Sequence, residues 1–205
     1  PIAGVFAISE IEVFAPSSAT ISGPVFGAEG IGLIQGSAVP FTESTIGAGA
    51  DFSDWRWWDG ARTQGNQELG RVLLTGAGSG FRDTIIQVGV LGEMLIDVGG
   101  FGIDDSWLWA GGDPVTEEGI GEITVRGGGI DGSDTPLWGF IPAISTNQNI
   151  GTIELTGPGV DLSNMNILSL KAIQSIEVQA AIVSDVPGEV MMTTAPLGIG
   201  LVSAG

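Results

Sequence analysis

The pattern Ile-x-x-Ile, followed by a polar and then an apolar residue, constrains the fold of this chain more than any other feature. It occurs four times, at Ile8–Val13, Ile120–Val125, Ile150–Leu155 and Ile173–Val178. The last three residues of each copy alternate apolar, polar, apolar. On a pleated strand this alternation puts the two apolar side chains on one face and the polar side chain on the other. Each copy is therefore predicted to be a β-strand.

The spacing of the copies favours independent strands over a true repeat. The copies begin at residues 8, 120, 150 and 173, so the intervals are 112, 30 and 23 residues. A solenoid is expected to keep a fixed period, and the recurrence is interpreted as convergent strand chemistry. Within each copy the two isoleucines are three positions apart. This odd offset would point them to opposite faces of a regular strand, so a bulge or corner could lie between them.

Glycine and proline are spread over the whole chain. The 35 glycines and 10 prolines follow no strict Gly-X-Y period, so they indicate turns and corners between short strands and exclude a collagen-like fold. Only Asn66–Leu74 and Leu162–Ala172 could hold a turn or two of helix. Strands are predicted at Ala3–Phe14, Ala19–Phe26, Ile31–Ile34, Ala38–Ile46, Arg71–Thr75, Thr84–Leu91 and Glu93–Val98.

These patterns predict an all-β protein with negligible helix, built either as a sandwich or as a stacked β-arch sheet. No shift in composition requires a domain boundary, so residues 1–205 are interpreted as a single all-β domain. A Trp-rich loop or insertion is expected at about residues 51–70, where three of the six tryptophans lie.

The charge of the chain argues against nucleic acid as a partner. The 24 acidic residues outnumber six scattered basic residues, and the formal net charge is −18. Proteins that neutralise phosphates need clustered Lys and Arg. The same charge makes copies of the chain repel each other at low salt, so close assembly would need cations or a salty medium.

The chain contains no cysteine, histidine or tyrosine. Disulfides, Cys/His zinc sites, thiol nucleophiles and Ser-His-Asp triads are thereby excluded. Carboxylate pairs can hydrolyse glycosides without histidine, but nothing in the sequence selects a pair, and we predict no enzyme. No stretch reaches the roughly 18 apolar residues of a membrane-spanning helix. The first residue is Pro1, which leads us to expect a processed, exported protein.

Two groups of acidic residues could supply oxygen ligands to a cation. Gly99–Asp104 fits the opening of the calcium-binding nonapeptide of parallel β-rolls, but it stands alone, and Ser106 occupies the position of a large apolar residue. The other acidic turn residues are Asp104, Asp105, Asp113, Glu117, Glu118, Asp131 and Asp134. Solvated turn carboxylates are the favoured interpretation. No metal ligand or cofactor is assigned, and calcium remains an alternative.

Tryptophan provides the strongest signal for binding. Trp55, Trp57 and Trp58 form one group, and Trp107 and Trp109 form another. Residues two apart on a strand share a face, so such pairs could present flat rings to sugars. Burial in the core or in a subunit interface is the favoured alternative, because Trp suits strands and contributes a large apolar area.

The apolar strand segments have few lysines to guard them. Monomeric β-proteins protect edge strands with charge, especially Lys, whereas this chain has only Lys171. In composition, and in segments such as Ile173–Val183, the chain resembles subunits of exported β-rich assemblies, including the amyloid-like tubular sheaths of some methanogenic archaea, surface-layer proteins and filament proteins. The resemblance implies an extracellular or cell-surface structural subunit that polymerises through strand pairing. The alternatives are a carbohydrate-binding or adhesin-like module and a virion tail-tube or capsid component.

Overall fold

The computed structural model describes most of the chain, and the account below is confined to that part. The described residues are 2–4, 8–14, 20–27, 29–38, 40–48, 67–76, 78–97, 102–111, 115–127, 129–130, 144–157, 166–179, 191–194 and 198–204. They form nineteen β-strands in two sheets, and they contain no helix.

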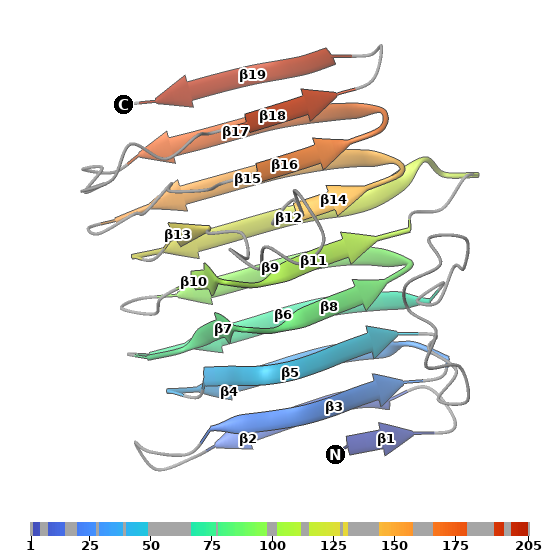
Figure 1. Ribbon diagram of the computed structural model, residues 1–205, viewed down its shortest axis with the longest axis vertical. Helices are drawn as coiled ribbons and strands as arrows, with labels where there is room; N and C mark the ends of the chain where they lie inside the picture. Colours follow the sequence, from blue (N-terminus) through green and yellow to red (C-terminus); the bar gives the residue numbers. More distant parts are fainter. Residues whose placement is uncertain are drawn as a thin grey trace.

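The strands of both sheets are parallel, and successive passes of the chain stack like rungs along one axis (Figure 1). The eight-stranded sheet contains β2 (Ile8–Phe14), β4 (Ile31–Ser37), β6 (Glu68–Thr75), β9 (Val90–Asp97), β12 (Glu118–Arg126), β15 (Asn149–Thr156), β17 (Ala172–Gln179) and β19 (Gly198–Ala204). The eleven-stranded sheet contains β1 (Ile2–Gly4), β3 (Ile21–Gly27), β5 (Pro40–Ala48), β7 (Gly80–Arg82), β8 (Ile85–Val88), β10 (Gly102–Asp104), β11 (Trp107–Ala110), β13 (Gly129–Ile130), β14 (Ile144–Thr146), β16 (Asn166–Ser169) and β18 (Met191–Thr194).

The chain alternates between the two sheets. Each pass through the eleven-stranded sheet is followed by one strand of the eight-stranded sheet, and we call this unit a coil. In three coils the pass is split into two short strands, β7 with β8, β10 with β11, and β13 with β14. The N-terminus and the C-terminus consequently lie at opposite ends of the stack (Figure 1).

Apolar residues lie in register from coil to coil. In the eight-stranded sheet the first apolar row consists of Ile8, Ile31, Leu69, Leu91, Ile120, Ile150, Ile173 and Ile199. The second apolar row consists of Ile11, Ile34, Val72, Met94, Ile123, Ile153, Ile176 and Val202. The third apolar row consists of Val13, Gly36, Leu74, Ile96, Val125, Leu155, Val178 and Ala204.

The eleven-stranded sheet has a matching row. It consists of Ile2, Val25, Ile46, Ile86, Leu108, Ile144, Ile167 and Met192. Residues of all four rows form one hydrophobic cluster, which includes Ile34, Ile86 and Ile153 at 0% exposure. Full burial of such a side chain contributes about 1.5–3 kcal/mol, so the rows are the main source of stability.

The expected irregularity between the two isoleucines is present. Ile120 and Ile123 are both buried, although they are three residues apart. In the six inner coils the strand register skips the residue after the first apolar row. This residue is Gln174 in β17, and in the other five inner coils it is one of five glycines. They are Gly32, Gly70, Gly92, Gly121 and Gly151. The interruption of the ladder lets both apolar residues face the same core.

The interpretation of the pattern as convergent strand chemistry was wrong. The four copies recognised in the sequence are β2, β12, β15 and β17 of the eight-stranded sheet, and four further strands continue the same rows. The repeat begins at residues 8, 31, 69, 91, 120, 150, 173 and 199, so its interval varies from 22 to 38 residues. The length varies because the connections between coils differ, and loop extension costs little free energy.

The all-β prediction is confirmed, with sheets that are parallel and curled and do not form a clear sandwich. The two windows that could hold a turn of helix are not helical in their described residues: Asn66–Leu74 overlaps β6, and Leu162–Ala172 includes β16, with residues 66 and 162–165 outside the described residues. In these windows Leu69, Val72 and Ile167 fill the core, and this tertiary packing overrides local helix propensity. The predicted strand Thr84–Leu91 is divided at Gly89 into β8 and the start of β9.

Candidate functional site

Within the part of the chain that the structure describes, β2 and β19 are the edge strands of the eight-stranded sheet. Among the described strands, β2 pairs only with β4, and β19 pairs only with β17. In the other sheet β1 pairs only with β3, and β18 pairs only with β16. The outer edge of an end strand carries backbone N–H and C=O groups that a further strand could bond. Each end of the stack is thus a template for strand addition.

The apolar rows are less well covered at the β2 end. Ile8 and Val13 are only partly buried, and Ile11 is 7% exposed, whereas Ile123 and Ile153 in the middle of the stack are 0% exposed. Inner coils are flanked by a coil on each side, but β2 has a neighbour on one side only. The end coil therefore leaves apolar surface that one more coil would cover.

The β2 end is also acidic. Glu10 and Glu12 are exposed on the outer face of β2, and the Nε2 atom of Gln35 on β4 donates a hydrogen bond to Oε1 of each carboxylate, at 2.9 Å for Glu10. Partial desolvation, together with repulsion from the Glu12 carboxylate, raises the pKa of Glu10 above its ordinary value. By contrast, the segment Gly198–Ala204 of β19 contains no charged residue. The two ends of the stack therefore differ in charge.

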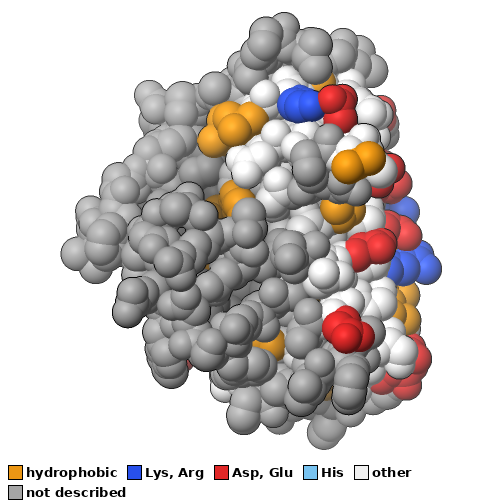
Figure 2. Space-filling view, turned by 90° about the vertical axis from the view of Figure 1, so that its right-hand side faces the viewer, with side chains coloured by type: hydrophobic (Ala, Val, Ile, Leu, Met, Phe, Trp, Pro, Cys, Tyr) orange, Lys and Arg blue, Asp and Glu red, His pale blue; other side chains and the backbone are white. Residues whose placement is uncertain are grey.

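Acidic side chains continue along the outer face of the eight-stranded sheet (Figure 2). Two ion pairs cross neighbouring strands: Arg71 Nη2 lies 3.0 Å from Glu93 Oε1, and Arg126 Nη1 lies 3.6 Å from Asp97 Oδ1. Glu154 and Glu177 lie in register on β15 and β17. Cations would reduce the repulsion between such neighbouring carboxylates.

Corners within the eleven-stranded sheet use an acidic residue followed by a buried hydroxyl residue. Asp83 and Asp105 have positive φ angles of 48° and 45°, and Thr84 and Ser106 are each 1% exposed. Glu43 and Ser44 repeat the arrangement within β5, with a φ of 48° at Glu43. Short polar residues tolerate this left-handed conformation better than apolar ones.

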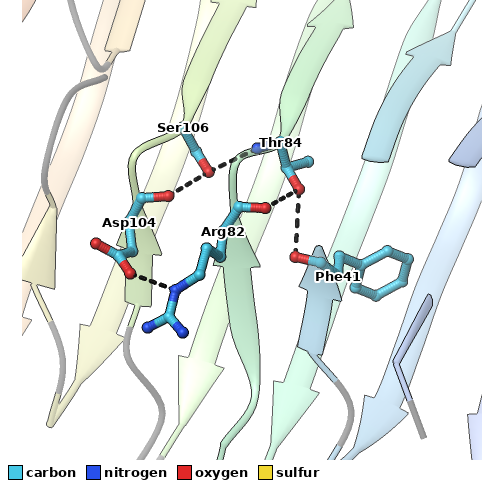
Figure 3. A network of polar contacts seen from close by, with 5 residues as sticks. All are labelled: Phe41, Arg82, Thr84, Asp104 and Ser106. Atoms are coloured by element: carbon cyan, nitrogen blue, oxygen red, sulfur yellow. Dashed lines mark hydrogen bonds and ion pairs between the residues drawn. The ribbon is translucent and has the colours of Figure 1, made fainter. Parts of the chain in front are cut away.

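The corner hydroxyls bond to their own coil and to a neighbouring coil (Figure 3). Thr84 Oγ1 donates to the carbonyl oxygens of Arg82 at 2.8 Å and Phe41 at 3.2 Å. Ser106 Oγ donates to the carbonyl oxygen of Asp104 at 2.6 Å and accepts from Thr84 N at 3.1 Å. These hydroxyls satisfy backbone groups where the ladder turns, so their role is structural.

Of the calcium candidate Gly99–Asp104, residues 99–101 lie outside the described residues. Gly102–Asp104 is strand β10, and Asp104 Oδ2 lies 2.6 Å from Arg82 Nε (Figure 3). Glu117 forms an ion pair with Lys171, and Glu118 begins β12. Asp113, Asp131 and Asp134 are outside the described residues. In the described part of the chain, no three acidic residues are grouped as metal ligands.

Trp107 and Trp109 share the outer face of the eleven-stranded sheet. Both are half-buried, and they alternate with Leu108 and Ala110, which are fully buried. Trp107 Nε1 donates a hydrogen bond of 3.3 Å to Ser145 Oγ. The side chains therefore lie on the face of the sheet opposite Leu108 and Ala110. Trp55, Trp57 and Trp58, with residues 51–66 of the expected loop, lie outside the described residues, whereas Glu68–Gly70 belongs to β6.

The described strands form a parallel two-sheet stack with an edge strand of each sheet at either end. No protein-family model, curated protein or solved structure matches the chain. Across the described ranges, no helix is long and apolar enough to cross a membrane. The open edges were expected from the shortage of lysines, but their position at the two ends of a stack was not. The recurring Ile-Gly and Leu-Gly pairs could have revealed every inner coil except that of β17, where Gln174 follows Ile173.

Proposed function

We propose that this protein is a structural subunit of the stacked β-arch type, which self-assembles through β-strand pairing into an extracellular sheath, filament or surface layer. The observation that carries this proposal is the pair of open edges on β2 and β19, which have the same apolar rows as the inner coils. A strand added at either end would gain backbone hydrogen bonds and bury apolar side chains.

Because the chain is strongly acidic, the proposed assembly depends on the salt concentration of the surrounding medium. With a net charge of −18, copies repel each other at low ionic strength. Salt or a divalent cation such as calcium would screen this repulsion and allow close approach. Assembly is therefore expected to increase between low and moderate salt, as in an extracellular medium.

Sedimentation velocity tests the proposal directly. Purified chain should sediment as species much larger than 20.9 kDa at moderate salt, and it should shift towards that mass when salt is removed. A chelator distinguishes a specific divalent cation from general screening, because it would leave a sodium-screened assembly intact. A monomer at every salt and calcium concentration would contradict the proposal.

A carbohydrate-binding module is the second candidate, and Trp107 with Trp109 is the observation that favours it. Their shared outward face gives two aromatic rings about 7 Å apart along the strand, with Ser145 and Gln87 in register beside Trp109. Aromatic faces suit sugar rings, and the amide and hydroxyl groups could bond sugar hydroxyls. Glycan-array binding that Trp109→Ala abolishes would favour this function, and binding to no glycan would count against it.

A further inference from the structure

We infer that copies of this chain join head to tail, with the outer edge of β19 in one copy pairing in parallel with the outer edge of β2 in the next. This inference rests on the proposed function and specifies its interface. The partner is a second copy of the same chain, and the contact is heterologous, so it adds coils along the axis of the stack.

Backbone direction favours this contact. All pairs in the eight-stranded sheet are parallel, so β2 and β19 expose opposite edges of one continuous ladder. Placing one copy on the next without reversal continues the parallel hydrogen bonds. A two-fold contact of β2 with β2 would instead require antiparallel pairing. Only the head-to-tail contact repeats the pairing already present within the chain.

The side-chain rows fix the register of the junction. Ile199, Val202 and Ala204 of β19 occupy the rows of Ile8, Ile11 and Val13 of β2. In register, the next copy would continue each apolar row and cover the partly buried Ile8 and Val13. The eleven-stranded sheet ends compatibly, because Met192 of β18 and Ile2 of β1 belong to its apolar row.

Charge disfavours the competing head-to-head contact. Pairing β2 with β2 would bring two copies of Glu10 and Glu12 together, whereas Leu201 and Ser203 occupy the corresponding positions on β19. Two like charges 4 Å apart cost about 1 kcal/mol in water and about 4 kcal/mol near a protein surface. Head-to-tail stacking sets the acidic edge against an uncharged one.

Cysteine cross-linking tests the register, because the natural chain has no cysteine. Glu12→Cys and Ser203→Cys are made as single variants and mixed. In-register parallel neighbours are about 4.8 Å apart, which is within the Cα separation of a disulfide. Under oxidation at moderate salt, the mixture should yield cross-linked dimers, and the double variant should yield a ladder of oligomers. Each single variant alone should remain uncross-linked.

Two further variants control for chemistry and register. Glu154→Cys with Glu177→Cys places two thiols in register inside one chain, so it should form an intramolecular disulfide and confirm that this geometry is competent. In a mixture of Glu10→Cys and Ser203→Cys, the two cysteines would be displaced by two residues, about 7 Å along the strand. This mixture should cross-link at least about fivefold less than the mixture of Glu12→Cys and Ser203→Cys.

The outcomes of these experiments distinguish a failure of the proposed interface from a failure of the proposed function. Large sedimenting species without Glu12–Ser203 cross-links would overturn the head-to-tail register while the assembly proposal stands. Dimers from Glu12→Cys alone would show a head-to-head contact and would also overturn the inference. A chain that stays monomeric at every salt concentration would overturn both proposals.

Discussion

A Cβ atom added to Gly151 would lie 2.1 Å from the carbonyl oxygen of Gly121 on the neighbouring coil. A Cβ atom added to Gly121 would likewise lie 2.3 Å from the carbonyl oxygen of Gly92, and one added to Gly92 would lie 2.4 Å from the carbonyl oxygen of Gly70. These glycines follow the first apolar row, where the strand register is interrupted. The coils approach so closely here that a side chain would force the backbones apart.

Replacing Gly151 with alanine is expected to lower the free energy of unfolding. The clash is with backbone, which cannot move aside without disturbing the neighbouring coil, so overpacking should cost about 1–3 kcal/mol. Urea unfolding followed by circular dichroism measures the change. Gln174→Ala is the control, because Gln174 is the exposed residue at the corresponding position of β17 and already carries a Cβ. Wild-type stability in Gly151→Ala would contradict the close approach.

Thr84→Val should destabilise the corner by about 1–2 kcal/mol, because the nearly isosteric valine cannot donate the hydrogen bonds to the carbonyl oxygens of Arg82 and Phe41. Thermal unfolding compares it with Thr45→Val, since Thr45 is half-buried on β5. The Thr45 variant should remain within about 0.5 kcal/mol of the natural chain. Equal effects of the two substitutions would argue against a bonding role for Thr84.

Glu10→Gln should stabilise the chain at pH 7. Because the folded-state pKa of Glu10 is raised, its contribution to stability is fully present below the ordinary pKa and is lost as the pH rises through the raised value. The neutral glutamine avoids that loss. The advantage of the variant, measured by urea unfolding across pH, should disappear at about pH 3, where the natural carboxyl is protonated in both states. An advantage that is constant between pH 3 and pH 7 would contradict this assignment.

A charge placed at Ser203 should change assembly in a direction set by Glu12, its proposed neighbour in the next copy. Ser203→Lys would meet opposite charge, and Ser203→Glu would meet like charge. An exposed pair contributes up to about 1 kcal/mol, so the critical concentration should fall about fivefold for Lys and rise about fivefold for Glu. Light scattering measures both. At high salt the critical concentrations of the two variants should converge. Identical critical concentrations at moderate salt would place Ser203 outside the interface.

The sequence predicted the strand content but only part of the repeat. Four copies were visible because they keep isoleucine in the first two rows and valine or leucine in the third. In β4 the two isoleucines are kept, but Gly36 occupies the third row. In β6 and β9 the rows continue with Leu69, Val72, Leu91 and Met94, which pack equally well in the core. Because different apolar side chains can fill the same core position, the residue types differ between these strands and the four visible copies. The three-residue spacing between the first and second rows is the same in all of them. The unequal loops then disguised the period.

The partners of the strands could not be predicted from alternation alone. Buried apolar residues on one face are compatible with parallel or antiparallel pairing. The corner hydroxyls were also missed, although Asp83-Thr84 and Asp105-Ser106 provide a repeated acidic-hydroxyl signal. The turn interpretation of Gly99–Asp104 did not include strand β10. Gly102 and Ile103 of this strand pair with β7 and β13.

Negative-stain electron microscopy of the purified chain, at low and moderate salt and with and without calcium, tests self-assembly most directly. We predict ordered tubes, sheets or fibres at moderate salt and far fewer at low salt. Dispersed single particles in every condition would contradict assembly as the function and would direct attention to the outward pair Trp107 and Trp109 as a binding surface.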